Sequence, residues 1–139
     1  MGSTLKDLLA NINPNFKIKY TPFFDKNMCI NGGKFRVIDN TNNLLVTYFV
    51  LSQMRGCNGV CISSNVVVEE EYRGNGLGTK FNYFREVLAK KMNYSLMLCT
   101  VVDGNEKQEK IMNKQGWTIC TKFLNLKTKN TVKLFFKPI

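Results

Sequence analysis

Histidine is absent from this chain of 139 residues, and it has only three prolines and one tryptophan. Without an imidazole, neither a serine nor a cysteine can be activated through a Ser-His or Cys-His pair, which disfavours a cysteine acyl-enzyme. The five cysteines are odd in number and irregularly spaced, so they predict no disulfide framework. Only Cys57 and Cys61 lie close together, and without histidine they make a poor zinc site. We therefore expect no metal, and chemistry that uses carboxylates, tyrosine, thiols, backbone groups or water.

Acidic residues are scarce as well, with 10 of them against 20 lysines and arginines, for a net charge of +10. The lysines are spread along the chain and form no single tract. Two interpretations stay open. The charge is either an ordinary solvated surface or an attraction for a polyanion such as nucleic acid, or for an acidic protein.

The sequence has no apolar run approaching the length of a membrane span, and its N-terminus lacks the basic-then-apolar order of a signal peptide. It also has no repeats, low-complexity segments or linkers. At 44% hydrophobic residues it can bury one core. We expect a single domain over residues 1–139, located in the cytoplasm and not in a membrane.

The first half of the chain predicts a short helix followed by strands. The helix is expected at 5–12 and the strands at 16–20, 28–30, 35–38, 44–51 and 59–68. Thr21-Pro22 would end the first strand, and Asn31-Gly32-Gly33 would form a hairpin turn.

The second half predicts a helix over 77–91, because Leu77, Phe81, Phe84 and Leu88 recur at helical spacing. A buried strand, a polar helix and a final hairpin follow at 95–102, 105–115, 117–123 and 131–136. The strand, helix and strand around 77–91 would form a right-handed parallel unit. The fold class is therefore α+β (α/β), with a mixed central sheet of about six to seven strands, a parallel pair and flanking helices.

A glycine-rich turn joins the strand at Val66–Val68 to this helix, as Arg73-Gly74-Asn75-Gly76-Leu77-Gly78. Unpaired N–H groups at a helix start, together with the helix dipole, form an anion site, and Arg73 adds a positive charge. We expect a pyrophosphate to bind here. The dinucleotide pattern G-x-G-x-x-G fails at Thr79, and the Gly-Lys-Ser/Thr of a P-loop is missing.

What matches is Arg-x-x-Gly-x-Gly, read from Arg73, Gly76 and Gly78. Between a strand and a long helix, this pattern resembles the coenzyme A-binding motif of the GNAT superfamily of N-acetyltransferases. Asn105 and Gly116-Trp117 also fall where that family has an Asn at the head of the next helix and a glycine-aromatic pair at its end. The resemblance implies a single GNAT-like domain, with a cofactor-binding core at 50–136 and a divergent acceptor-side part at 1–45.

The resemblance also implies the site. The parallel strands would flank a cleft for acetyl-CoA, and the backbone N–H near Val67 or Val68 would hold the thioester oxyanion. The resemblance supplies no base, because no carboxylate falls where some family members carry one. The candidates are Asp103, at the mouth of the expected cleft, and one of Glu69, Glu70 and Glu71 acting through water, although that run is also typical of a solvated strand end. The residues expected to bind the cofactor are Val66, Val67, Val68, Arg73, Gly74, Asn75, Gly76, Leu77, Gly78, Thr79 and Asn105.

The chain departs from the family at the general acid, because Met112 stands where a tyrosine is frequent. Three alternatives stay open. The thiolate leaves unassisted or through water, or another residue replaces the acid, or the domain binds acyl-CoA without turnover. The substitutes considered are Tyr72, Tyr94, Cys99 and Cys120.

The resulting hypothesis is an acetyl-CoA-dependent N-acetyltransferase in which an amine attacks the thioester directly. The acceptor stays open between a small molecule, a protein and an aminoacyl-tRNA, and a homodimer is compatible with the resemblance. The alternative hypothesis is a degenerate module that binds acyl-CoA, nucleic acid or an acidic protein.

Overall fold

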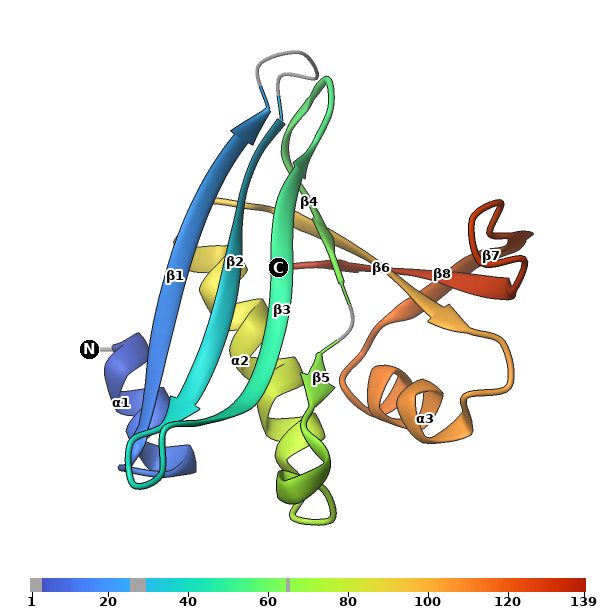
Figure 1. The fold of residues 1–139 in the computed structure, drawn as a ribbon. Helices are drawn as coiled ribbons and strands as arrows, with labels where there is room; N and C mark the ends of the chain where they lie inside the picture. The colour runs from blue at the N-terminus through green and yellow to red at the C-terminus, as the bar shows by residue number, and fades with distance from the viewer. Residues whose placement is uncertain (1–3, 26–29, 65) are drawn as a thin grey trace.

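The computed structural model describes residues 4–25, 30–64 and 66–139 (Figure 1). Its helices are α1 (Leu5–Ile12), α2 (Leu77–Lys91) and α3 (Glu106–Lys114), with a short 3-10 helix η1 (Glu70–Tyr72). Its strands are β1 (Phe16–Asp25), β2 (Ile30–Asp39), β3 (Leu44–Met54), β4 (Cys57–Ser63), β5 (Val67–Val68), β6 (Leu96–Val102), β7 (Thr118–Leu124) and β8 (Thr131–Pro138).

These strands form one mixed sheet in the order β1-β2-β3-β4-β6-β8-β7, with β5 paired to β3 off this path. Strands β4 and β6 are parallel, while the other described pairs are antiparallel. The expected mixed sheet with a parallel pair and flanking helices is confirmed. The two-residue strand β5 brings the described strands to eight, where six or seven were expected.

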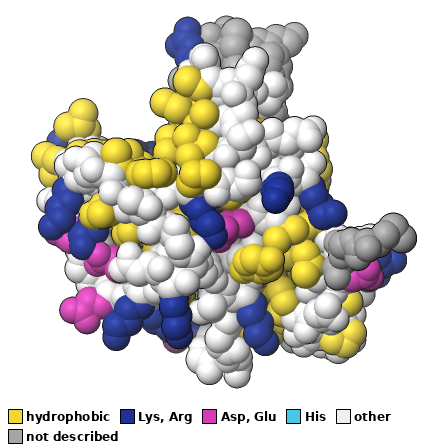
Figure 2. Space-filling model, turned by 180° about the vertical axis from the view of Figure 1, so that it is seen from behind, with side chains coloured by type: hydrophobic (Ala, Val, Ile, Leu, Met, Phe, Trp, Pro, Cys, Tyr) yellow, Lys and Arg dark blue, Asp and Glu magenta, His cyan; other side chains and the backbone are white. Residues whose placement is uncertain are grey.

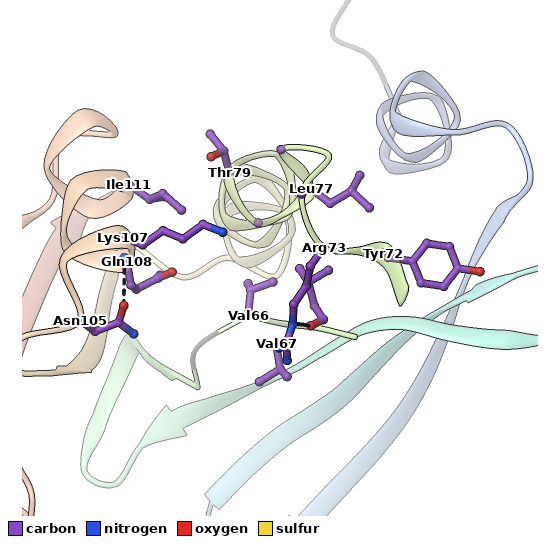
Figure 3. Close-up of a pocket in the computed structure, with 14 residues that line it drawn as sticks. Val66, Val67, Tyr72, Arg73, Leu77, Thr79, Asn105, Lys107, Gln108 and Ile111 are labelled. Carbon is purple, nitrogen blue, oxygen red and sulfur yellow. Dashed lines mark hydrogen bonds between the residues drawn. The ribbon is translucent and has the colours of Figure 1, made fainter. Parts of the chain in front are cut away.

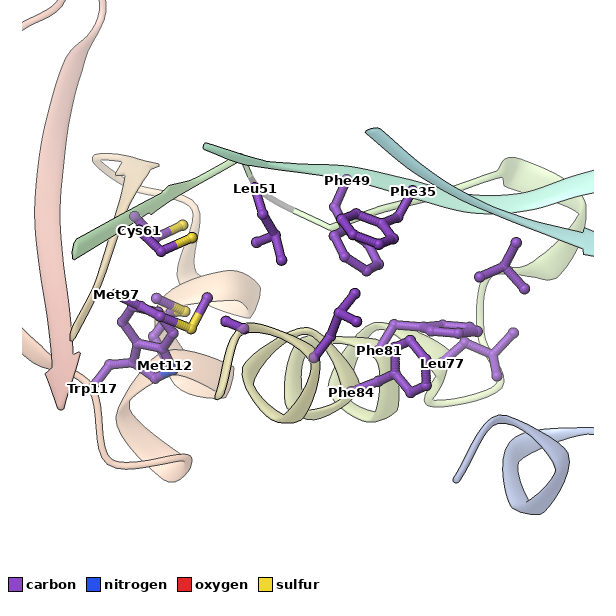
Figure 4. Close-up of a cluster of buried hydrophobic side chains, with 14 of the residues drawn as sticks. Phe35, Phe49, Leu51, Cys61, Leu77, Phe81, Phe84, Met97, Met112 and Trp117 are labelled. Atoms are coloured by element: carbon purple, nitrogen blue, oxygen red, sulfur yellow. The ribbon is translucent and has the colours of Figure 1, made fainter. Parts of the chain in front are cut away.

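Helix α2 is the crossover between the parallel strands, and its predicted apolar stripe is confirmed. Leu77, Phe81, Phe84 and Leu88 are buried on the face that packs against the sheet. Figure 4 shows Phe81 and Phe84 below the rings that β2 and β3 contribute. Helices α1 and α2 lie behind β1, β2 and β3 in the view of Figure 1, so the core lies on that side of the sheet.

The N-terminal hairpin differs from the sequence prediction. Strand β1 continues through Pro22, which pairs with Gly33, because an edge strand tolerates a proline. Gly32 and Gly33 lie inside β2 and not in a turn. A Cβ at Gly33 would come within 2.1 Å of the Tyr20 ring, and one at Gly32 within 2.3 Å of the Phe23 ring. These glycines therefore make room for aromatic rings. The predicted strand residues 28 and 29 lie outside the described residues.

The strand predicted at 59–68 is two strands. Both pair with β3, at Ser63↔Leu51 and at Val67↔Tyr48. The chain advances four residues from Ser63 to Val67 while β3 advances three from Leu51 to Tyr48, so one extra residue forms a bulge. Strand β6 pairs with β4 only as far as the Ser63↔Cys99 position. Beyond this point β5 and β6 diverge, and an opening forms in the sheet.

Candidate functional site

A cavity of about 710 Å³ occupies this opening. Its walls are β5, the glycine turn with the first residues of α2, and the first turns of α3 (Figure 3). The lining residues are Val66, Val67, Val68, Tyr72, Arg73, Gly74, Gly76, Leu77, Gly78, Thr79, Asn105, Lys107, Gln108 and Ile111. The cavity therefore brings together two stretches that are distant in the sequence, residues 66–79 and 105–111.

Two glycines set the shape of the turn before α2. Gly74 and Gly76 have φ angles of 85° and 72°, in the left-handed region that favours glycine. Gly76 is the N-cap of α2, and it provides no side chain to bond the N–H groups of the first turn. No atom lies within 4 Å of a Cβ built at Gly74 or Gly76, so the space above the turn is open. An uncapped helix start that faces a cavity is suited to an anion.

Two basic side chains reach this region from opposite walls. Arg73 donates from Nε to the carbonyl oxygen of Val68 at 2.8 Å, which places its guanidinium beside β5. Lys107 extends from α3 toward the start of α2 (Figure 3). Together with the helix dipole, these cations give the glycine end of the cavity a positive potential.

The β5 wall is fixed by its own hydrogen bonds. Thr47 donates its hydroxyl to the carbonyl oxygen of Val67 at 2.7 Å, and Arg73 bonds the next carbonyl. Val66 and Val68 pack against the hydrophobic core. The opposite wall begins at Asn105, whose side chain caps α3 by accepting the N–H of Gln108 at 3.3 Å. Both walls are therefore held in place by contacts of the protein itself.

The structure brings together most of the residues that the sequence indicated. All the expected cofactor-binding residues line the cavity except Asn75, whose side chain donates to the carbonyl oxygen of Tyr72 at 3.4 Å. Asp103 is not among the lining residues. Its carboxylate lies 3.5 Å from the Lys122 amine and 3.4 Å from the Lys133 amine.

These ion pairs affect the acidity of Asp103. Desolvation by itself would raise the pKa of this carboxyl, but the nearby charge of Lys122 and the hydrogen bond and charge of Lys133 outweigh it, so the pKa is lowered. A base works best when its pKa is near the working pH. The lowered pKa would make Asp103 a weak base.

None of the four substitutes considered for the missing acid is free to serve the cavity. Tyr72 lines it, but the hydroxyl points away and donates to Asp39 at 2.8 Å (Figure 3). Cys99 is buried in the core, and desolvation raises its pKa. Tyr94 and Cys120 are not among the lining residues. Met112 is fully buried in the core.

Sequence reasoning missed Arg85, which is fully buried in the middle of α2. It donates to the Ser64 carbonyl oxygen at 2.7 Å and to the Asn82 side-chain oxygen at 2.6 Å. Its guanidinium carbon also lies 5.4 Å from the centre of the Trp117 ring. Position 85 falls one turn after Phe81 on the apolar stripe, and this spacing is the sequence signal that could have indicated its burial.

Neither a protein-family profile nor a curated protein sequence matches this chain. Solved structures do. An IAA acetyltransferase from Bacillus cereus superposes with a TM-score of 0.69 at 11% identity, covering 88% of this chain and all (100%) of that one. YncA from Salmonella typhimurium, solved with its cofactor acetyl-CoA, gives 0.63 at 14% identity, over 77% of this chain and 64% of that one.

The NatC complex bound to Gag peptide and CoA gives a TM-score of 0.65 at 14% identity, over 76% of this chain and 70% of that one. At these identities the likeness concerns the fold. None of the helices in the described part of the chain is long and apolar enough to span a membrane. The likeness to these solved structures shows that the chain has the acetyltransferase fold that the GNAT resemblance predicted.

Proposed function

We propose that this chain is an acetyl-CoA-dependent N-acetyltransferase. The observation that carries the proposal is the uncapped, glycine-bounded start of α2, which opens beside Arg73 into the cavity between β5 and α3. The fold shared with acetyltransferase structures, two of them solved with CoA or acetyl-CoA, supports it.

In this proposal, the amides at the start of α2 and the Arg73 guanidinium hold the diphosphate of the cofactor. The edge of β5 that faces away from β3 holds the pantetheine arm by backbone hydrogen bonds, as an added strand would be held. Lys107 adds a positive charge from the α3 wall. Residues 50–136 then form the cofactor-binding core, and residues 1–45 contribute to the acceptor side.

The proposed reaction is a direct transfer. The lone pair of a neutral amine attacks the thioester carbonyl, the Val68 region donates a backbone N–H to the oxyanion, and the C–S bond then breaks. One proton leaves the attacking nitrogen, and the departing thiolate gains one. Among the described lining residues, no tyrosine hydroxyl or thiol points into the cavity, so water is the proposed carrier. A thiol pKa near 8.5 makes the thiolate a tolerable leaving group. The role of Asp103 as the base stays a prediction.

Isothermal titration calorimetry with acetyl-CoA tests the binding step. We expect saturable binding, with ATP as the control because it carries phosphates but no pantetheine arm. Absence of acetyl-CoA binding at millimolar concentration would contradict the proposal. Release of free thiol in the presence of a panel of amines, proteins and aminoacyl-tRNA then tests transfer and identifies the acceptor class.

A second candidate function is acyl-CoA binding without turnover. Two observations favour it, namely the fully buried Met112 and the engagement of the Tyr72 hydroxyl with Asp39. Tight binding of acetyl-CoA without thiol release for any amine would select this function.

A further inference from the structure

The first three strands present a broad face that no helix covers within the described part of the chain. Helices α1 and α2 lie behind β1, β2 and β3, while α3 lies to the side below β6 (Figure 1). We call the opposite surface of β1–β3 the outer face. On such a face, alternate residues of the three strands point outward, and their side chains determine what the face can bind.

Strand alternation puts four cations on the outer face. Phe16 is buried and Tyr20 stacks on the buried Phe35 at 4.8 Å between ring centres, so Lys17 and Lys19, which alternate with them, point outward. The outward cations are Lys17 and Lys19 on β1 and Lys34 and Arg36 on β2. All four are exposed, and none forms an ion pair with a described residue.

The pairing register brings like charges together. Lys19 is directly opposite Arg36, and like charges in that position destabilise a sheet. Lys34 lies two residues from Arg36 on the same face. The fold therefore keeps a cluster of cations that no carboxylate of the described residues pairs with, and this favours an anionic partner.

Two aromatic rings, those of Tyr48 and Phe23, accompany these cations. Tyr48, opposite Arg36 on β3, lies under the Lys34 amine at 5.5 Å from its ring centre. The ring of Phe23 lies over Gly32, where a Cβ would come within 2.3 Å of it, and the side chain is 41% exposed. Phe23 thus rests on the strand with an accessible ring. Cations beside exposed rings are the combination that binds single-stranded nucleic acids, through phosphate contacts and base stacking.

We propose that the outer face binds a single-stranded nucleic acid. The exposed ring of Phe23 favours this partner over an acidic protein. The carboxylates of an acidic protein would pair with the cations only, whereas the bases of a nucleic acid would also stack on the ring. The outer face adjoins the candidate site, because Tyr48 on β3 pairs with Val67 on β5, and Val67 lines the cavity. The inference is independent of the proposed acyl transfer.

The test is fluorescence anisotropy with a labelled oligo(U) of about 16 nucleotides, and a labelled poly-glutamate peptide of similar length as the rival probe. With four cations contacting phosphates, the logarithm of the binding constant should fall against the logarithm of salt concentration with a slope of about −3. Lys19→Gln with Arg36→Gln should weaken oligo(U) binding about tenfold and reduce that slope by about 1.4.

The matched control is Lys110→Gln with Lys127→Gln, which removes the same charge at exposed positions away from the outer face. Phe23→Leu should weaken binding about fivefold without changing the salt slope, because it removes stacking and no charge. Equal weakening by the two double variants would overturn the proposal in favour of net charge. Binding of poly-glutamate but not oligo(U) would overturn it in favour of an acidic protein.

Discussion

The buried guanidinium of Arg85 donates a hydrogen bond of 2.7 Å to the carbonyl oxygen of Ser64. This bond ties the middle of α2 to the first residue after β4, where the sheet begins to open. The same side chain bonds Asn82 and lies over Trp117. Asn82 in turn donates to Gln115, whose side chain reaches back to the carbonyl oxygen of Thr79 at 2.9 Å. A buried polar network therefore runs beside the candidate site and joins α2 to the end of α3.

Replacing Arg85 should destabilise the fold. Arg85→Ala leaves a cavity and two unpaired acceptors, so we expect a loss of about 3–5 kcal/mol in the free energy of unfolding. Arg85→Met keeps most of the volume and should lose about 1–3 kcal/mol. Urea denaturation measures both losses, with the exposed Lys90→Met as the control on the same helix. Trp117 is the sole tryptophan, so its emission should shift in both Arg85 variants and not in the control.

Arg73 should contribute to cofactor affinity. Arg73→Ala removes the charged hydrogen bonds proposed for the diphosphate, and we expect acetyl-CoA to bind about 10- to 100-fold more weakly in calorimetry. Arg73→Lys keeps the charge and should recover part of this affinity. Arg55→Ala, at an exposed position outside the cavity, is the control. Unchanged affinity in Arg73→Ala would refute the diphosphate site.

Alanine substitutions at the two glycines of the α2 start, Gly76 and Gly78, should distinguish an effect on stability from an effect on acetyl-CoA binding. Gly76→Ala forces alanine to a φ of 72°, which costs about 1 kcal/mol of stability. Gly78 has no positive φ, and a Cβ there would lie 3.9 Å from the end of the Ile111 side chain, an ordinary contact. Gly78→Ala should therefore keep or raise stability, by about 0.5 kcal/mol, while it narrows the cavity and weakens acetyl-CoA binding. Thermal denaturation and calorimetry on the same samples distinguish the two effects.

The ion pairs of Asp103 should appear in the pH dependence of stability. Because its pKa is lowered in the folded chain, its contribution is present above the ordinary aspartate pKa near 3.9 and is lost as the pH falls through the folded value. Asp103→Asn should therefore lower the melting temperature at pH 7 and match the unsubstituted protein at strongly acidic pH. Glu71→Gln, at an exposed residue with no ion pair among the described residues, should show no such difference. A constant gap between the melting curves at every pH would contradict this assignment.

Sequence patterns predicted the elements that depend on local periodicity. The stripe of Leu77, Phe81, Phe84 and Leu88 gave the bounds of α2, because a helix packed on a sheet repeats its apolar residues every three to four positions. Helix α1 is also confirmed at Leu5–Ile12, with Thr4 as its N-cap. The glycines before α2 indicated the turn because their positions require positive φ angles.

Long-range contacts explain the misses. Gly32 and Gly33 suggested a turn, but their role depends on the rings of Phe23 and Tyr20 on the neighbouring strand. The break between β4 and β5 depends on the pairing with β3, and no local signal in the valines marks it. The environment of Arg85 depends on three segments that meet only in the folded chain.

The single extra residue between Ser63 and Val67 has an evolutionary consequence. Deleting one residue there would let Ser63 and Val67 pair with Leu51 and Tyr48 in one continuous register, which would remove the bulge and leave the valines on their present faces. The bulge is thus encoded by the number of residues in this segment rather than by their identity. Substitutions in the segment can accumulate without removing the bulge, whereas one lost codon would remove it.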